Sequence, residues 1–315
     1  MTPEAEFEEL RPLLFSIAYR ILGSVGEAED AVQETWLRFA ATSTEPDSLK
    51  AYLSTVVTRI SLDVLRSARV RRETYVGPWF PDPLPTDTFG GEHEDIYASP
   101  ERATELADSV SMAALLLLER LSPLERAVFV LREVFHFGFA DIAAAVDRSE
   151  AACRQLASRA RRHMDDGKPR FEADRRKRLE LADRFFEALR DGDLERLQVL
   201  LAADVETVND GGGVAGGVGG RYGAEKAARI LVTAVPPLLA IGARLEQREL
   251  NGEPGAILRD DDGSILGTWT LDILDDQIQR IRSVTNPAKL GHLGPVADLK
   301  DVVRRRNRHR HHRGS

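Results

Sequence analysis

Hydrophobic residues recur at helical spacing through most of residues 4–72. Over Glu27–Phe39, the alanine, valine and aromatic positions fall on one stripe, and most of the acidic and amide positions fall outside it. The next periodic stretch, from about Leu49 to Arg72, begins apolar and ends with a run of arginines. This pattern predicts a bundle of amphipathic helices whose last helix has a basic end.

The helical pattern stops at residue 77. The sequence from 77 to 100 reads GPWFPDPLPTDTFGGEHEDIYASP, and its many prolines and glycines exclude a helix interior. We therefore expect an acidic linker over 77–104, with helices resuming near Pro100.

A second helical region follows the linker, and neighbouring residues mark where one of its helices begins. Ser122, Pro123 and Glu125 stand in the N-cap, first-turn and capping-box positions of a helix that should run to about Phe135.

The next segment predicts a helix-turn-helix. A short helix over 139–146 and a tight turn over 147–149 lead into a longer helix that Ser149 would cap. The apolar side of this longer helix is predicted to consist of Cys153, Leu156, Ala157, Ala160 and Met164.

From about Phe171 the pattern changes to mixed helices and strands. Two predicted helices (171–190 and 193–202) precede a glycine cluster, and strands dominate the end. The remaining predicted elements are a strand over 205–208, a helix over 223–235 and strands over 243–250, 255–260, 264–274 and 277–285. Helices against a curved antiparallel sheet indicate a separate α+β domain.

The length and composition of the chain are those expected of a protein with two or three soluble domains. The 315 residues are enough for two or three domains, and 43% are hydrophobic. The single cysteine, Cys153, excludes an internal disulfide and a cysteine-based zinc site. The acidic N-terminus lacks the plan of a signal peptide, and the longest dense apolar run, 112–118, is too short to span a bilayer. We expect a cytoplasmic protein with no membrane contact.

The net charge of −8 argues against a general polyanion binder, so any nucleic-acid contact should be local. In the longer helix of the helix-turn-helix, the early exposed residues should lie nearest to base edges. Arginine can pair with guanine and glutamine with adenine, and later arginines would meet phosphates. The candidates are Arg154, Gln155, Ser158 and Arg159 for bases, and Arg161 and Arg162 for phosphates. A solvated basic face is the alternative.

Two other charged clusters also have two readings. The arginines between Arg59 and Arg72 suit a helix C-terminus, but their number suggests phosphate contact. For the acidic and amide face made by Glu29, Asp30, Gln33 and Glu34, composition favours a solvated surface, and the pattern alone does not decide between this and a functional surface.

No catalytic, metal or cofactor site is indicated by motif. DGGGVAGGVGG lacks the lysine and hydroxyl ending of a phosphate-binding loop, so we expect a flexible or closely packed loop. An acid or base inside an apolar pocket would be needed for catalysis. The candidates by residue type are Asp204, Glu206, Tyr222 and Trp269.

Two stretches resemble one family. AEDAVQETWLRF and LKAYLSTVVTRISLDVLRSARVRRETY are similar to domain 2 of the extracytoplasmic-function (ECF) RNA polymerase sigma factors, and LERLSPLERAVFVLREVFHFGFADIAAAVDRSEAACRQLASRARRHM is similar to their domain 4. WFPDP, NDGGG and TNPAKL resemble marks of a subgroup that carries a fused SnoaL-like, NTF2-type domain. The resemblance implies domain 2 over 1–76, domain 4 over 105–167 and a regulatory cone over 171–292. It does not cover the arginine-rich tail, and from the basic sequence of 293–315 we expect that segment to be disordered.

The resemblance also implies partners and roles. Core polymerase would bind through its largest-subunit clamp coiled coil and its flap, and the clamp would take Asp30, Gln33, Glu34 and Leu37. The minus-ten element would meet Arg59, Arg66, Arg69, Arg71 and Arg72, and the minus-thirty-five element would meet the basic helix through Arg154, Gln155 and Arg159. The residues implied for contact between the fused domain and the linker are Trp79, Pro81, Asp210, Gly211, Gly212, Gly213, Asn286, Pro287 and Leu290.

At three places the sequence departs from the family pattern, and there the roles implied by the resemblance are less secure to assign. Many members have asparagine where Arg59 stands. Ala151 and Ala152 leave the front of the recognition helix short of polar side chains. The glycines of NDGGG lack the lysine that often follows them in the subgroup.

We therefore expect a promoter-specific transcription initiation factor that catalyses nothing itself and needs no cofactor. The fused domain would pack on domain 2 and the WFPDP linker, and would regulate the factor in place of a separate anti-sigma protein. A small ligand in its pocket is one candidate trigger. The alternative function is an NTF2-like isomerase or hydrolase domain attached to a DNA-binding module.

Overall fold

The computed structural model describes residues 2–42, 46–73, 75–89, 111–167, 175–213 and 219–298, together with 301, 302 and 304. The chain divides into two compact units. The N-terminal unit contains residues 1–74 and 86–168, and the C-terminal unit contains residues 75–85 and 169–315. The chain thus leaves the first unit at Tyr75, returns to it at Thr86, and leaves it again after Lys168.

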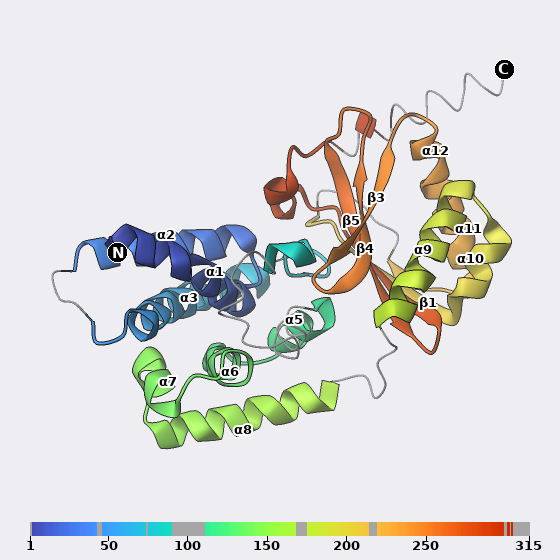
Figure 1. Ribbon diagram of the computed structural model, residues 1–315. Helices are drawn as coiled ribbons and strands as arrows, with labels where there is room; N and C mark the ends of the chain where they lie inside the picture. Colours follow the sequence, from blue (N-terminus) through green and yellow to red (C-terminus); the bar gives the residue numbers. More distant parts are fainter. Residues whose placement is uncertain are drawn as a thin grey trace. The chain divides into compact units, whose positions relative to one another are not determined.

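Three helices begin the N-terminal unit: α1 (Pro3–Leu22), α2 (Val25–Ala40) and α3 (Leu49–Glu73) (Figure 1). The Thr2 hydroxyl caps the start of α1, and Gly23, with φ of 70°, ends it in the left-handed conformation. Ser24 then caps α2, so a two-residue turn reverses the chain. The three helices pack against one another around buried aliphatic side chains.

The second half of this unit contains η1 (Thr86–Phe89), α5 (Met112–Leu118), α6 (Pro123–Phe129), a π-helical turn η2 (Val130–Val134), α7 (Phe139–Val146) and α8 (Glu150–Gly167). The predicted capping box at the start of α6 is confirmed, because the Ser122 and Glu125 side chains each bond the other's backbone N–H. The predicted resumption of helix near Pro100 lies outside the described residues. Helix α3 contacts both α6 and α7, so the two halves form one body.

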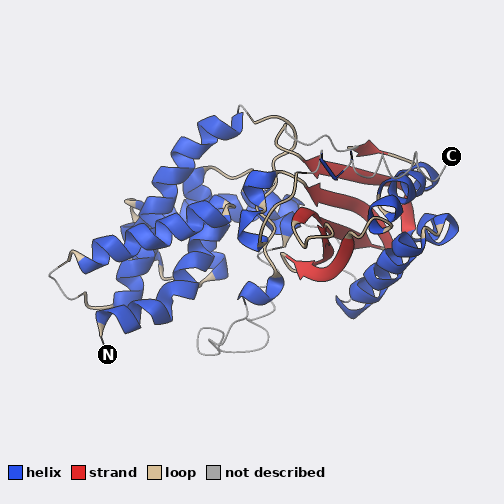
Figure 2. Ribbon diagram, turned by 90° about the horizontal axis from the view of Figure 1, so that it is seen from above, coloured by secondary structure: helices blue, strands red, loops and turns tan. Residues whose placement is uncertain are grey.

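The C-terminal unit is a six-stranded sheet with helices on one face (Figures 1 and 2). Its helices are α9 (Arg175–Asp191), α10 (Leu194–Leu200), α11 (Ala224–Ala234) and α12 (Pro236–Leu239). Its strands are β1 (Leu201–Asp210), β2 (Gly220–Arg221), β3 (Arg244–Leu250), β4 (Glu253–Arg259), β5 (Ile265–Leu274) and β6 (Gln277–Val284), in the order β2-β1-β6-β5-β4-β3. Phe185 and Phe186 of α9 and Leu197 of α10 pack with Ile281 of β6 in the main core.

The prediction of an antiparallel sheet is wrong at one pair of strands. β1 and β6 run parallel, with Thr207 opposite Ile281, while the other pairs are antiparallel. Parallel neighbours need a long connection between them, and α11, α12 and the four strands β2 to β5 supply it here. The sheet is therefore mixed, and the end of β1 lies beside the end of β6.

The prediction of disorder from residue 293 is also wrong for the first part of that segment. Val296 forms a parallel bridge with Ile265 of β5, and the Ala297 N–H donates to the Ile265 carbonyl at 2.9 Å. Val302 is 2% exposed and packs with Leu258 and Leu266. Because Val296 pairs with the backbone of β5 and Val302 packs against the sheet, the chain stays attached after the last strand. Residues 305–315 lie outside the described part.

Candidate functional site

Helices α7 and α8 form the predicted helix-turn-helix. Asp147 ends α7 in the left-handed conformation, with φ of 52°. The Ser149 hydroxyl accepts from the Ala152 N–H at 3.2 Å, as expected of an N-cap. The apolar side of α8 is buried as predicted: Cys153, Leu156, Ala157, Ala160 and Met164 are all at most 8% exposed. Burial raises the pKa of the Cys153 thiol.

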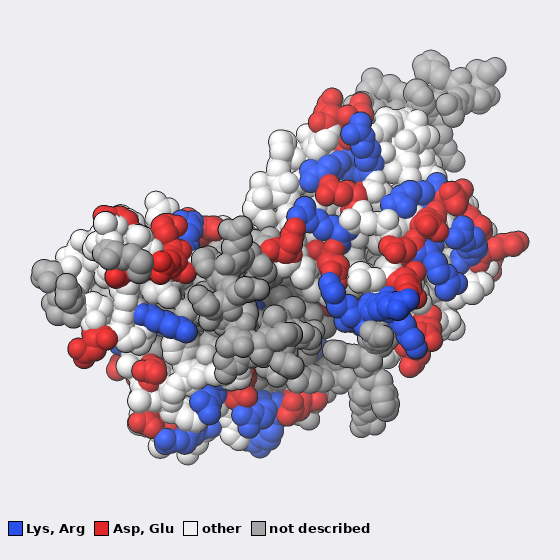
Figure 3. Space-filling model, viewed as in Figure 1, with Lys and Arg blue, Asp and Glu red and all other residues white. Residues whose placement is uncertain are grey.

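The opposite side of α8 is exposed and rich in arginine. Positive side chains gather on the lower edge of the N-terminal unit, where α8 lies (Figure 3). Several of these arginines have carboxylate partners: Arg154 pairs with Glu150, Arg159 with Glu125 and Arg161 with Glu133. The predicted base- and phosphate-contacting residues that are exposed here are Arg154, Gln155, Ser158, Arg159, Arg161 and Arg162.

The predicted minus-ten residues lie along α3, and two of them, Arg59 and Arg66, have intramolecular partners. Arg59 donates from Nη2 to the Ala144 carbonyl at 2.6 Å and from Nε to the Ala145 carbonyl at 3.3 Å. These carbonyls belong to the last turn of α7, where backbone oxygens lack helical partners and the helix dipole is negative. Arg66 pairs with Asp63 on α3 itself. The side chains of Arg69, Arg71 and Arg72 lie outside the described residues.

A buried arginine makes a second link between the two halves of this unit. Arg126 of α6 is 2% exposed, and its Nη1 donates to the Ile21 carbonyl at the end of α1 at 2.9 Å and to Glu119 at 2.5 Å. Its Nε is buried without a hydrogen-bond partner. The Arg20 guanidinium lies 5.2 Å from the centroid of the Phe135 ring. Arginine contacts thus join α1 and α3 to the helix-turn-helix half.

The predicted polymerase-binding face is the outer side of α2. Leu37 is 55% exposed there, and Glu34 pairs with Arg38 at 2.8 Å; Asp30 and Gln33 are exposed on the same helix. An exposed leucine among acidic and amide side chains is a surface that a partner can cover.

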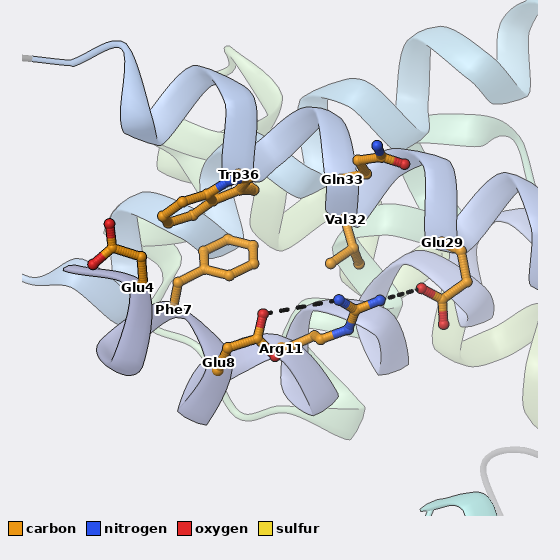
Figure 4. A pocket seen from close by; sticks show the side chains of 8 residues that line it. All are labelled: Glu4, Phe7, Glu8, Arg11, Glu29, Val32, Gln33 and Trp36. Atoms are coloured by element: carbon orange, nitrogen blue, oxygen red, sulfur yellow. Dashed lines mark hydrogen bonds and ion pairs between the residues drawn. The ribbon is translucent and has the colours of Figure 1, made fainter. Parts of the chain in front are cut away.

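A hollow of about 420 Å³ adjoins this face, between α1 and α2 (Figure 4). Phe7 and Trp36 line its apolar side, with ring centroids 5.0 Å apart. On the other side, the Arg11 guanidinium lies between the carboxylates of Glu29, at 2.7 Å, and Glu8, at 3.9 Å. Gln33 belongs both to the hollow and to the predicted polymerase-binding face.

In the C-terminal unit, residues 75–85 are bound by the ends of β1 and β6. The Asp210 carboxylate is fully buried and has three donors. Its Oδ1 accepts from the Tyr75 hydroxyl, and its Oδ2 accepts from the Phe80 N–H at 2.8 Å and from Lys289 Nζ at 2.7 Å. An aspartate at the end of β1 therefore holds a segment that precedes it by more than a hundred residues.

Lys289 completes this cluster. Its ammonium group also donates to the Phe80 carbonyl and lies 4.1 Å from the centroid of the Trp79 ring. Asn286 donates from Nδ2 to the Tyr75 hydroxyl at 2.8 Å. We call Tyr75, Trp79, Phe80, Asp210, Asn286 and Lys289 the latch. Burial and the Asp210 carboxylate raise the pKa of the Tyr75 hydroxyl well above its usual range, so Tyr75 stays a donor.

Two glycines of NDGGG fit closely around the latch. Gly212 has φ of 58°, and a Cβ there would lie 2.5 Å from Asn286 Nδ2. Gly213 has φ of 73°, and a Cβ would lie 3.2 Å from the Val76 side chain. Gly211 is buried beside Asp210. Positive φ and close contacts explain why these positions are glycine, so a phosphate-binding function is not needed to account for them.

The other end of residues 75–85 joins the edge of the sheet. Leu84 and Asn251 bond reciprocally: the Leu84 N–H donates to Asn251 Oδ1 at 2.9 Å, and the Asn251 N–H donates to the Leu84 carbonyl at 2.8 Å. Pro85 forms an antiparallel bridge with Leu250 at the end of β3. The segment is therefore anchored at both ends.

The predicted linker-contact residues occupy different places around this segment. Trp79 and Asn286 belong to the latch, and Pro81 and Leu290 are buried. Pro287 is exposed and begins the short helix η3 (Pro287–Lys289), which Asn286 caps. Sequence reasoning missed Tyr75, Phe80 and Lys289. Lys289 lies within the noted TNPAKL stretch and Phe80 within WFPDP, so the motifs were the available signal.

The four candidate catalytic side chains have separate partners. Asp204 is exposed and pairs with Arg221 at 3.6 Å, and Glu206 pairs with Arg280 at 2.6 Å. The Tyr222 hydroxyl donates to the Gly219 carbonyl, and Trp269 packs against the main core. This arrangement does not assemble an acid and a base around one site.

Comparison with known proteins identifies the two halves of the N-terminal unit. The sigma-70 region 2 family model matches residues 7–71, and the sigma-70 region 4 model matches residues 111–164. None of the described helices is both long enough and apolar enough to cross a membrane.

Two relatives and a solved structure extend the match beyond these two regions. The chain is 42% identical over 212 residues to the ECF RNA polymerase sigma factor SigJ of Mycobacterium tuberculosis, covering 67% of this chain and 66% of SigJ. It is 31% identical over 286 residues to the probable ECF RNA polymerase sigma factor SigI of the same species, covering 89% of this chain and 92% of SigI. The crystal structure of SigJ superposes with a TM-score of 0.67 at 34% identity, over 93% of this chain and 99% of that one. The protein described here belongs to the ECF RNA polymerase sigma factors.

Proposed function

We propose that this sigma factor directs core RNA polymerase to promoters through the residues described above. Helix α8 would read the minus-thirty-five element, α3 would hold the minus-ten element, and the outer side of α2 would bind the clamp of the largest subunit. The exposed arginines of α8 and the exposed Leu37 support these assignments. The acidic total charge makes binding to DNA without polymerase weak.

We further propose that the N-terminal unit has the closed conformation that the factor adopts before it binds polymerase. The minus-ten and minus-thirty-five elements lie about 25 base pairs apart, on the order of 85 Å along the helix axis. In this structure, Arg59 of α3 bonds directly to the end of α7. Helices of 25 and 18 residues are only about 37 and 27 Å long. One closed body of this size does not reach both elements, so the two regions must separate on polymerase.

The C-terminal unit is proposed to be a SnoaL-like regulatory domain, and the latch is the observation that carries this proposal. Residues 75–85 lie between the two matched sigma regions, which end at 71 and begin at 111. The buried Asp210–Lys289 pair holds this segment to the C-terminal unit. A domain that binds the connecting chain limits how far the two sigma regions can separate. The C-terminal unit would therefore regulate the factor without contacting DNA.

The test compares promoter-specific transcription by core polymerase with the full-length factor and with variants of the latch. Asp210→Asn keeps the size of the side chain but removes its charge, and Lys289→Met keeps the apolar stem. Asp204→Asn, an exposed position on the same strand, is the matched control. We expect specific transcripts from the unaltered factor, a changed yield with both latch variants, and no change with the control.

Two results would contradict these proposals separately. If the unaltered factor gives no promoter-specific transcripts and does not bind core polymerase, the residue assignments for promoter recognition fail. If transcription is specific but both latch variants match the unaltered factor, the regulatory role of the C-terminal unit fails.

A further inference from the structure

The start of α8 holds one arginine by two independent contacts. Arg154 Nη2 donates to Glu150 Oε2, one turn earlier, at 2.6 Å. Its guanidinium also lies 5.1 Å from the centroid of the Phe139 ring, the first residue of α7. Arg132 of η2 contacts the same ring at 4.8 Å. Side chains from both helices of the helix-turn-helix therefore meet at Arg154.

Each contact is weak alone, since the side chains of Arg154 and Glu150 are 56% and 45% exposed. Together they act on the same flexible side chain. A glutamate four residues before a cation is the favourable orientation on a helix, and stacking on an aromatic ring suits the planar guanidinium. The two contacts reduce the number of conformations that Arg154 samples before DNA arrives.

Arg154 still has donors for a base. A guanidinium carries five N–H groups, and the bond to Glu150 comes from Nη2 alone. Guanine presents two acceptors in the major groove, O6 and N7, and arginine pairs with both. In a helix-turn-helix, the first turns of the second helix face the base edges. Ala151 offers no polar group at this end of α8, so Arg154 is a principal donor there.

We propose that Glu150 and Phe139 are positioning residues that preset Arg154 to read one guanine of the minus-thirty-five element. This inference rests on the proposed function of α8. Arg159 and Arg161 differ from Arg154, because their carboxylate partners, Glu125 and Glu133, belong to α6 and η2. Both lie later in α8, and of the two Arg161 is the one predicted to contact a phosphate.

The experiment is transcription by core polymerase and full-length factor on a promoter library randomised across the minus-thirty-five element. The variants are Arg154→Ala, Glu150→Gln and Phe139→Leu. Glu225→Gln is the matched control, because Glu225 and Arg229 form the same type of pair, four residues apart, on α11. Sequencing of the transcripts gives the base preference at each position.

We expect the unaltered factor to prefer guanine at one position by roughly tenfold or more. Arg154→Ala should remove this preference. Glu150→Gln and Phe139→Leu should each lower it by roughly threefold at that position and leave other positions unchanged, because two partial restraints hold one side chain. Glu225→Gln should change nothing.

Four results would overturn the inference while leaving sigma activity intact. Arg154→Ala could change no position, or Glu150→Gln could leave the preference unaltered or lower all positions equally, as a structural role would. A change at a different position in Glu150→Gln would show that Glu150 reads a base itself. If the unaltered factor yields no promoter-specific transcripts, the proposed function fails and this inference fails with it.

Discussion

The latch in the C-terminal unit and the contacts between the two sigma regions in the N-terminal unit use the same chemistry. In both, a long cationic side chain donates to backbone carbonyls of a distant segment: Lys289 to Phe80, Arg59 to Ala144 and Ala145, and Arg126 to Ile21. They differ in how completely their polar groups are paired and protected from water. Lys289 and Asp210 are buried and paired with each other. Arg126 is also buried, but its Nε has no hydrogen-bond partner, and Arg59 is exposed.

The N-terminal unit also contains buried polar atoms without hydrogen-bond partners. Among the described residues of this unit, they are Ser54 Oγ, Thr58 Oγ1 and Arg126 Nε. An unpaired buried polar atom costs about 1–3 kcal/mol. Two of these three atoms lie on α3, the helix that contacts α6 and α7, and the third lies on α6. If the sigma regions separate on polymerase as proposed, these unpaired atoms predict that their contacts with each other break more easily than the contacts of the latch.

The largest effect is expected at the centre of the latch. Asp210→Ala leaves the Lys289 ammonium buried without its carboxylate, and breaking such a pair costs about 3–5 kcal/mol. We expect the Phe80 amide to lose protection against hydrogen exchange, and the C-terminal unit to unfold at a lower temperature. Asp204→Ala, at an exposed position on the same strand, should do neither. Unchanged protection at Phe80 would show that the latch is dispensable.

A smaller effect tests the close approach of NDGGG to Asn286. Gly212→Ala and Gly263→Ala both place a side chain at positive φ, with strain of about 1–2 kcal/mol. Only at Gly212 does the new Cβ meet another side chain, since the space around Gly263 is open. Gly212→Ala should therefore destabilise the C-terminal unit more than Gly263→Ala, by roughly 1 kcal/mol or more. Equal losses in thermal unfolding would indicate that Asn286 moves aside freely.

A gain in stability is expected where a buried hydroxyl lacks a partner. Thr58→Val removes an unpaired group with little change of shape, and should stabilise the N-terminal unit by roughly 1 kcal/mol. The matched control is Thr35→Val, because Thr35 is equally buried but its hydroxyl donates to the Ala31 carbonyl at 2.7 Å. Thr35→Val should not stabilise. Denaturant unfolding measures the stability of both variants. A loss of stability in Thr58→Val would contradict the view that the unpaired Thr58 hydroxyl destabilises the N-terminal unit.

The elements that sequence predicted best are those whose signals are local. The capping box at Ser122 and the turn at Asp147 depend on neighbouring residues, so the helix-turn-helix and the buried side of α8 could be predicted residue by residue. The latch could not be derived in this way. Tyr75 and Asp210 are 135 residues apart, and no periodic pattern connects them; only the motif resemblance pointed to the region.

Other differences have the same origin. The parallel pairing of β1 with β6 and the attachment of Val296 and Val302 depend on distant strands. The sequence shows that Arg59 belongs to a basic cluster, but it does not show that Arg59 bonds to the C-terminal end of α7.

The smallest effect is expected at Arg59, because an exposed hydrogen bond competes with water. Arg59→Met keeps the apolar stem and removes both bonds to α7, at a cost of about 1 kcal/mol. Arg66→Met, on the same helix, removes only a pair within α3 and is the control. The readout is hydrogen exchange in the free factor at Asp147 and Arg148, whose amides donate to the Ala143 carbonyl. Opening should raise their exchange roughly fivefold in Arg59→Met alone. Because Arg59 is also a proposed DNA contact, the free factor separates its two roles: unchanged exchange with reduced transcription would assign Arg59 to DNA and leave Arg126 as the main link between the sigma regions.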